Sequence, residues 1–352
     1  MYRNMNHKII DEMINLFDLN LSNLNVYTEA ASNSYFLNPI LALKAGARKV
    51  FAQSKDSNYG KSINISNSLY KNAKELNLHH NLEILDSRNH HCLSESDIIT
   101  NSGFVRPIDK NLILSLKKTA VIPLMWETWE YRKDDFDLEE CKKNSILVLG
   151  TNETEYPCDM TLYMGELAIK LLMNLNYDES KILLIGRDPS PAGHIYNELL
   201  KMKKEVTFVS STNRSNIKYN EFKKYFLKHG SEYTYIILAD FMSDQSLIGE
   251  DGLITFKEIE KINPQIKIGI ISGAFDIKGL FDSSLKFYPK NFPHENYKMK
   301  YHLSELGVEP VLKLFTAGLK VGQEMAFARN NGLNIKDSKL HAIKNSPAMD
   351  FI

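Results

Sequence analysis

The sequence predicts an α/β protein made of two doubly wound parallel-sheet domains, the second of them Rossmann-like, joined by a long helix. Short apolar runs alternate with helix-length segments, which is typical of βαβ units and a parallel sheet. This alternation continues to Leu149, gives way to one long helical pattern, and restarts at Lys181. The 352 residues are enough to form two hydrophobic cores.

The first domain is expected to begin with an amphipathic helix, because Ile9, Ile10, Met13, Ile14 and Phe17 recur at helical spacing. Predicted strands follow at 24–27, 49–52, 82–85, 97–100, 119–125 and 146–149, with helices at 36–46, 61–76, 109–117 and 137–144.

A single helix is predicted from Tyr156 to Asn174, crossing from the first domain to the second. The second domain has predicted strands at 181–185, 206–209, 235–239 and 266–271. A helical tail from 304 is expected to pack back on the first domain. The domains are therefore placed at 1–155 (substrate domain), 156–303 (nucleotide-binding domain) and 304–352 (C-terminal helical segment).

The composition favours a small molecule as the ligand of this protein. With 43 basic and 43 acidic residues the formal charge is zero, so no overall field attracts nucleic acid or an anionic membrane. The three cysteines form no metal or disulfide pattern, and the first residues lack the apolar core of a signal peptide. A cytoplasmic protein is expected.

The turn after Ile185 is the main candidate for a cofactor site. A buried strand leads into Gly186-Arg187-Asp188-Pro189-Ser190-Pro191-Ala192-Gly193, followed by a helix and a second strand. In a Rossmann unit such a turn brings backbone N–H groups and a helix N-terminus to a pyrophosphate. The middle glycine of the fingerprint is missing here, and each proline removes a backbone donor. A purely structural turn is the alternative.

The end of the second of these strands bears on which dinucleotide would bind. NAD usually meets an Asp or Glu at that place, whereas this chain has Ser210, Ser211, Thr212, Asn213 and Arg214. Because an Arg fork suits a 2′-phosphate, NADP is favoured over NAD. A solvated polar turn is the alternative.

The order of these segments resembles the D-2-hydroxyacid dehydrogenase and formate/glycerate dehydrogenase superfamily, with S-adenosylhomocysteine hydrolase as a structural cousin. The resemblance covers residues 97–285 and is carried by the segment Phe136–Val148, the helix after Asp159, the Gly186 turn and the segment Ile270–Asp276. It implies a catalytic cleft between the two lobes and, by analogy, a dimer. The family's substrate-clamping Arg is replaced by Ser272, which puts standard 2-hydroxyacid reduction in question.

Polar clusters follow the strands of the first domain, at the edge where open α/β sheets bind ligands. Glu29, Asp56, Arg106, Glu127 and Glu153 are expected to converge there. A carboxylate beside Trp126 and Trp129 would have a raised pKa and suit acid or base catalysis, and Arg106 would anchor a substrate carboxylate or phosphate. For each residue alone, a capping or surface role is the alternative.

The sequence thus favours an enzyme, an NAD(P)-dependent oxidoreductase of a small amino, keto or hydroxy acid. The predicted catalytic residues are Glu29, Arg106 and Glu127, and the predicted cofactor-binding residues are Gly186, Arg187, Asp188, Ser190, Gly193, Ser211, Arg214 and Ser272. No metal site is predicted. The alternatives are a non-redox transferase, lyase or hydrolase that has lost the dinucleotide, and a metabolite-binding regulatory protein.

Overall fold

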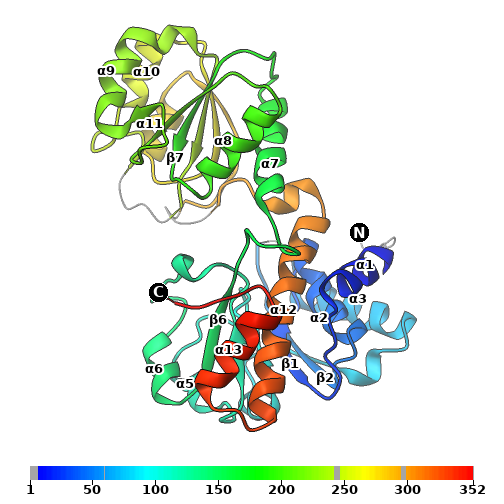
Figure 1. Ribbon diagram of the computed structural model, residues 1–352. Coiled ribbons are helices and arrows are strands. Elements are labelled where there is room, and N and C mark those ends of the chain that lie inside the picture. Colours follow the sequence, from blue (N-terminus) through cyan, green and yellow to red (C-terminus); the bar gives the residue numbers. More distant parts are fainter. Residues whose placement is uncertain (1–6, 59, 242–245, 295–298, 352) are drawn as a thin grey trace. The chain divides into compact units, whose positions relative to one another are not determined.

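The chain folds into two compact units, and the second is inserted into the first along the sequence (Figure 1). The computed structural model describes residues 7–58, 60–241, 246–294 and 299–351. Unit 1 comprises Met1–Asp159 and Gly307–Ile352, and unit 2 comprises Met160–Leu306. The observed boundaries therefore lie a few residues beyond the predicted ones.

Unit 1 is built on a sheet of order β13-β6-β5-β4-β1-β2-β3. Its strands are β1 (Asn25–Glu29), β2 (Lys49–Gln53), β3 (Leu82–Leu85), β4 (Ile98–Ile99), β5 (Val121–Pro123), β6 (Leu147–Thr151) and β13 (Ala348–Met349). All neighbours pair in parallel except β13, which runs antiparallel to β6. The chain therefore reverses its direction of winding between β1 and β4.

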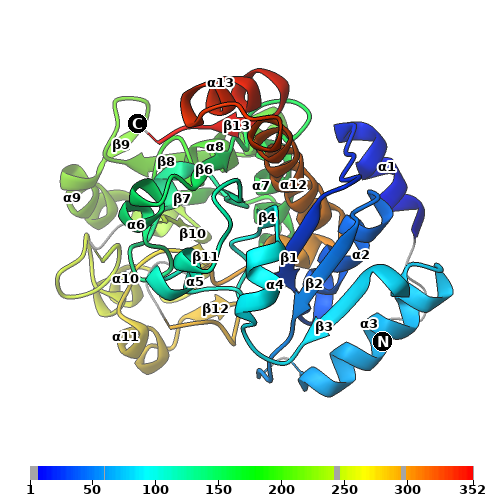
Figure 2. The ribbon, with the colours of Figure 1, turned by 90° about the horizontal axis from the view of Figure 1, so that it is seen from below.

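Helices cover both faces of this sheet (Figure 2). On one face, α4 (His90–Glu95), α5 (Lys110–Leu114) and α6 (Leu138–Lys143) share a core with Tyr27 and Ile122. On the other, α12 (Glu309–Asn330) contacts β4, β5 and β6 and also α1 (His7–Phe17), α2 (Leu37–Lys44) and α13 (Ile335–Asn345). The remaining helix is α3 (Ser62–Glu75).

Two glycines allow α12 to lie close to the sheet. A Cβ on Gly318 would fall 2.1 Å from Sδ of Met125, and one on Gly322 would fall 2.9 Å from Cγ of Pro123. Lys320, on the same helix, donates to the carbonyl of Asp18 and pairs with Glu324. The glycine pair is thus explained by packing.

Unit 2 has a six-stranded parallel sheet of order β12-β11-β10-β7-β8-β9. The strands are β7 (Ile182–Gly186), β8 (Val206–Ser210), β9 (Ile217–Lys218), β10 (Tyr235–Ala239), β11 (Lys267–Ser272) and β12 (Lys286–Tyr288). In chain order this is the 3-2-1-4-5-6 arrangement of the Rossmann fold, read from β9 to β12. The predicted fold class is confirmed.

The helices of unit 2 form two layers around its sheet (Figure 1). One layer is α7 (Thr161–Asn174) and α8 (Ala192–Lys201), and the other is α9 (Tyr219–His229), α10 (Phe256–Ile262) and α11 (Ile277–Asp282). The central strands β7 and β10 are buried at every residue because both faces of the sheet are covered, which is why they are continuous apolar runs in the sequence.

The prediction of one helix over 156–174 was wrong at its start. α7 begins at Thr161 and belongs to unit 2. Pro157 disfavours the helical region for Tyr156 and has no N–H to donate, so the first five residues run as an irregular connection.

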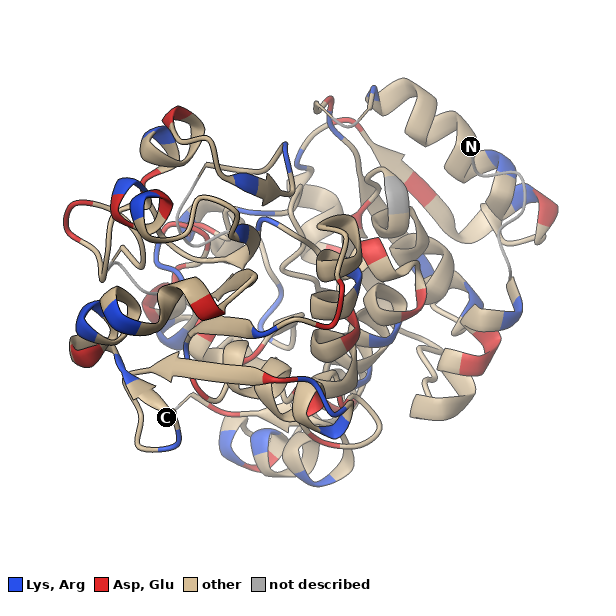
Figure 3. Ribbon diagram, turned by 90° about the horizontal axis from the view of Figure 1, so that it is seen from above, with Lys and Arg blue, Asp and Glu red and all other residues tan. Residues whose placement is uncertain are grey.

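Acidic and basic residues are interspersed along the described part of both units (Figure 3). Within the same residues, every helix is too short or too polar to cross a lipid bilayer.

Candidate functional site

The direction of winding reverses in both sheets, and ligands of open α/β sheets bind at such switch points, beyond the carboxyl ends of the strands. In unit 1 the switch point lies between β1 and β4. Glu29 is the last residue of β1, and the loop Thr100–Pro107 follows β4. We call this group of residues the unit 1 site.

Glu29 is buried at the switch point, with 4% of its surface exposed. Its Oε2 accepts a hydrogen bond from the N–H of Phe104 at 2.9 Å. Burial raises the pKa of Glu29 to about 7, against the opposing effects of the Phe104 amide and the Arg106 charge. This carboxyl group can therefore gain or lose a proton near neutral pH, as a general acid or base must.

Arg106 is held beside Glu29 by a fixed set of contacts. Its Nη1 pairs with Oδ2 of Asp135 at 2.7 Å, and its guanidinium lies 5.1 Å from the ring centroid of Trp126. A Cβ on Gly103 would lie 3.3 Å from Oε2 of Glu29 and 3.8 Å from Nη2 of Arg106, so the two side chains flank this glycine. The Nε of Arg106 is buried and has no hydrogen-bond partner among the described residues. It can donate to an anionic substrate.

Buried hydroxyl and amide groups complete the unit 1 site. Thr100 Oγ1 lies 3.0 Å from Thr28 Oγ1 and 2.8 Å from Ser102 Oγ, which forms a short chain of hydroxyls between β1 and the loop. Asn101 is 1% exposed, and its Nδ2 lacks a partner in the described chain, while its Oδ1 accepts from the N–H of Met125 at 2.9 Å. A polar ligand would satisfy this amide.

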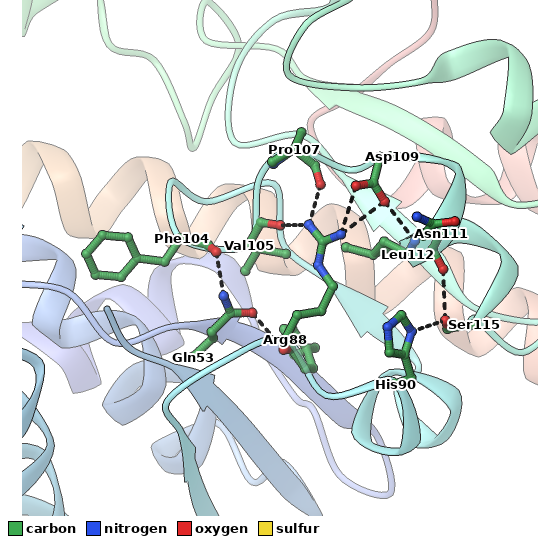
Figure 4. Close-up of polar contacts among 11 residues, drawn as sticks. Gln53, Arg88, His90, Phe104, Val105, Pro107, Asp109, Asn111, Leu112 and Ser115 are labelled. Carbon is green, nitrogen blue, oxygen red and sulfur yellow. Dashed lines mark hydrogen bonds and ion pairs between the residues drawn. The ribbon is translucent and has the colours of Figure 1, made fainter. Parts of the chain in front are cut away.

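Arg88 braces the loop that carries Arg106 (Figure 4). Its guanidinium donates to the carbonyl oxygens of Val105 and Pro107 at 3.3 and 2.6 Å and pairs with Asp109 at 3.0 Å. From the other side, Gln53 Nε2 donates to the carbonyl of Phe104 at 2.8 Å. Sequence reasoning missed this role of Arg88. All of its acceptors except Asp109 are backbone carbonyls, and a backbone carbonyl is present at every residue, so the sequence gives no sign of such a contact.

Glu127 belongs to a second group of carboxylates after β5 and β6. It accepts from Trp129 Nε1 at 2.5 Å and from the N–H of Glu153 at 3.2 Å. Burial raises the pKa of Glu130 to about 7, with a smaller effect of the Glu127 charge, and raises that of Glu153 well above its usual range, helped by Glu130 and Glu127. The charge of Arg132 opposes the shift at Glu130, and its guanidinium lies 5.9 Å from the ring centroid of Trp126, the ring that Arg106 also approaches.

Asp56 does not share these contacts. It is exposed and bonds to Lys61 and to the N–H of Ser62 at the start of α3. Glu29, Arg106, Glu127 and Glu153 thus lie at the carboxyl ends of β1, β4, β5 and β6, whereas Asp56 serves the start of a helix.

Unit 2 has its switch point between β7 and β10, beside the predicted cofactor turn. Gly186 ends β7, and a Cβ there would fall 1.9 Å from the carbonyl oxygen of Ala239 and 2.8 Å from Cβ of Ala192. The glycine is therefore required for the close packing of β7, β10 and α8.

Asp188 takes up the space at the start of α8. Its side chain is 10% exposed, pairs with Arg214 Nη2 at 2.7 Å and accepts from Thr212 Oγ1 at 2.9 Å. A Cβ on Gly193 would fall 2.1 Å from Oδ1 of Asp188 and 2.6 Å from Nη2 of Arg214. Gly193 thus makes room for an ion pair within the chain.

The backbone of the turn offers few donors to a pyrophosphate. The N–H groups of Ala192 and Gly193 both donate to the carbonyl of Arg187, at 3.1 and 3.3 Å. The N–H of His194 donates to the carbonyl of Pro189, and Pro189 and Pro191 have no N–H. With Asp188 also present, the start of α8 does not fit a pyrophosphate bound in the usual Rossmann manner.

The neighbouring strand ends do fit a polar ligand such as a ribose. Asp240, just after β10, is 3% exposed; its Oδ2 accepts from Tyr219 at 3.2 Å, and its Oδ1 has no hydrogen-bond partner in the described chain. Burial raises the pKa of Asp240 to about 6. Ser272, at the end of β11, is fully buried, and its hydroxyl also lacks a partner there. Sequence reasoning missed Asp240, although it follows a predicted strand.

The remaining predicted cofactor residues lie around the same edge of unit 2. Ser190 is half-buried in the turn, while Arg187 and Ser211 are exposed at the ends of β7 and β8. All eight predicted residues thus end β7 or β11, follow β7 or β8, or lie in the first turn of α8.

Comparison with known proteins supports the fold. No family model and no curated protein matches the sequence. Among solved structures, a dipicolinate synthase chain from Bacillus halodurans is similar with a TM-score of 0.50 and 7% identity, covering 84% of this chain and 96% of that one. A 2-hydroxyacid dehydrogenase from Ketogulonicigenium vulgare Y25 has a TM-score of 0.50 and 10% identity, covering 89% and 96%. The predicted resemblance to the 2-hydroxyacid dehydrogenases is confirmed at the level of the fold.

Proposed function

We propose that this chain is an oxidoreductase that uses NAD or NADP and acts on a small polar amino, keto or hydroxy acid. The observation that carries the proposal is the fold, which is similar over 89% of the chain to a 2-hydroxyacid dehydrogenase. The Rossmann strand order of unit 2 is consistent with a nucleotide ligand. So are Oδ1 of Asp240 and the hydroxyl of Ser272 near its switch point, which have no hydrogen-bond partner among the described residues.

The unit 1 site would bind the substrate. Arg106, whose Nε has no hydrogen-bond partner in the described part of the chain, suits the carboxylate of an acid. Glu29 would exchange a proton with the substrate oxygen or nitrogen, because its pKa of about 7 leaves both protonation states populated at neutral pH. Glu127, bonded to Trp129 and to the amide of Glu153, would contribute negative charge beside them.

The carboxyl edge of unit 2 would hold the cofactor, whose nicotinamide ring accepts or supplies hydride. Ser272, Ser190 and Ser211 would bind sugar or phosphate oxygens, and Arg187 would balance the phosphate charge. Since the start of α8 is occupied by Asp188, these side chains would have to replace the missing amide donors.

Two measurements test the proposal. Calorimetric titration of the full chain with NADH and NADPH is expected to give saturable binding of at least one, and no binding at millimolar concentration of either would refute it. Cofactor oxidation with a panel of 2-keto acids is then expected to fall by about a hundredfold or more in Glu29→Gln and Arg106→Lys. Glu139→Gln, which removes an exposed carboxylate paired with Lys142 in the same unit, should leave turnover unchanged.

A non-redox enzyme is the second candidate, and the Asp188–Arg214 pair is the observation that favours it. It predicts that neither dinucleotide binds, while Glu29→Gln and Arg106→Lys still abolish turnover of the true substrate. The two candidates therefore predict different results for dinucleotide binding and the same loss of turnover in the two variants.

A further inference from the structure

Three side chains at the start of α8 form one closed group of contacts in unit 2. Asp188 contributes the carboxylate, and Arg214 and Thr212 are its two partners, at 2.7 and 2.9 Å. Arg214 also donates to the carbonyl of Gly193 at 3.2 Å. Both contacts use Nη2, so one end of the Arg214 guanidinium is held by a carboxylate and a helix carbonyl while its side chain is 47% exposed.

This group lies where a Rossmann unit distinguishes the two dinucleotides. The residues after the second strand, here β8, meet the adenosine ribose: an acid there accepts from the 2′-hydroxyl of NAD, and an arginine binds the 2′-phosphate of NADP. After β8 this chain has Arg214 and Thr212, and both are already bonded to Asp188. The acid comes from the β7–α8 turn instead.

We propose that Asp188 is the residue that selects the cofactor of unit 2, and that it selects NAD. This inference rests on the proposed function. A 2′-phosphate would meet an arginine whose charge Asp188 already offsets, and it would lie near that carboxylate of the same sign. A 2′-hydroxyl is uncharged and can donate to Asp188 without breaking the ion pair.

The packing indicates that the pair is built into the fold. Asp188 is nine-tenths buried, unlike the carboxylates of ordinary surface ion pairs. Gly193 leaves the space that the pair occupies, since any side chain there would overlap with both Asp188 and Arg214. Any anion that reaches the exposed part of the Arg214 guanidinium therefore meets a charge that Asp188 already offsets.

The test compares the dissociation constants of NADH and NADPH for the full chain and two variants. The unaltered chain is expected to bind NADH at least tenfold more tightly than NADPH. Asp188→Asn frees the arginine charge and should move the ratio at least tenfold toward NADPH, because a charge-assisted contact is gained. Arg214→Gln leaves Asp188 in place and should move it further toward NADH.

Glu179→Gln is the matched control, because it removes an exposed carboxylate that pairs with Lys204 in the same unit. It should leave the ratio unchanged. A native preference for NADPH, or a ratio that stays within twofold in both Asp188→Asn and Arg214→Gln, would overturn the inference while the proposed function stands. Absence of binding of both dinucleotides to the unaltered chain would remove the proposed function and this inference together.

Discussion

Replacing Glu29 by Gln is expected to stabilise the protein above neutral pH. Glu29 is 4% exposed, and its pKa rises from its ordinary value of 4.5 to about 7 on folding. The folded state therefore prefers the protonated form. The stability that this group contributes is complete below pH 4.5 and is lost as the pH rises through about 7.

The size of the effect follows from the two pKa values. The difference between 4.5 and about 7, at 1.36 kcal/mol for each pH unit, corresponds to about 3 kcal/mol. Gln is uncharged at every pH, and its amide oxygen can still accept from the N–H of Phe104. Glu29→Gln should therefore match the unaltered protein near pH 4.5 and exceed its free energy of unfolding by about 3 kcal/mol at pH 8.

Urea unfolding of both proteins between about pH 4.5 and 8.5 measures this difference. Glu83→Gln is a control of opposite sign in the same unit, because a hydrogen bond from Lys49 lowers the pKa of Glu83 and the ionised form is stabilising. A Glu29→Gln variant that is less stable at about pH 8, or whose advantage does not grow with pH, would refute the assignment of a raised pKa to Glu29.

The other predictions concern packing, the loop brace and the cysteines. Gly186→Ala should destabilise the protein more than Gly318→Ala. The new Cβ at 186 would meet a backbone carbonyl at 1.9 Å, whereas the new Cβ at 318 would meet a flexible methionine side chain. Thermal unfolding of the two variants measures this difference, and equal losses of stability would contradict the explanation. Arg88→Ala should lower the free energy of unfolding by about 2–4 kcal/mol and speed amide hydrogen exchange in the loop 103–109, because the loop loses its contacts with the guanidinium. Unchanged exchange rates would show that the loop keeps its conformation without Arg88. Burial raises the pKa of Cys92 to about 11 and that of Cys141 to about 12, so neither should react with a thiol reagent at about pH 8 until urea unfolds the chain; rapid labelling of the folded protein would refute this.

Most strands could be located from the sequence because the strands of a covered parallel sheet are buried on both faces. Ile182–Gly186 and Tyr235–Ala239 are continuous apolar runs for this reason. The edge strands β9, β12 and β13 are two or three residues long and lack such a run, so no pattern marks them. The helix α13 lies within the predicted helical segment 304–352, but its own bounds could not be predicted, because its buried residues are Ser338 and Ala342 and form no apolar pattern.

The candidate site could be predicted only as a set of strand ends. Glu29, Arg106 and Glu127 follow strands in the sequence, and the parallel sheet brings such positions to one edge. The partner of each side chain depends on distances that the sequence does not contain. On its chemistry alone Arg214 suits a phosphate, whereas in the structure it contacts Asp188.

The insertion of unit 2 into unit 1 has a consequence for synthesis on the ribosome. All strands of unit 2 have been made once Tyr288 is added, whereas the sheet of unit 1 waits for α12 and for β13 at Met349. The inserted unit can therefore fold during translation while the apolar face of β4, β5 and β6 still lacks its covering helix. That uncovered face is the surface that a chaperone would protect in the nascent chain.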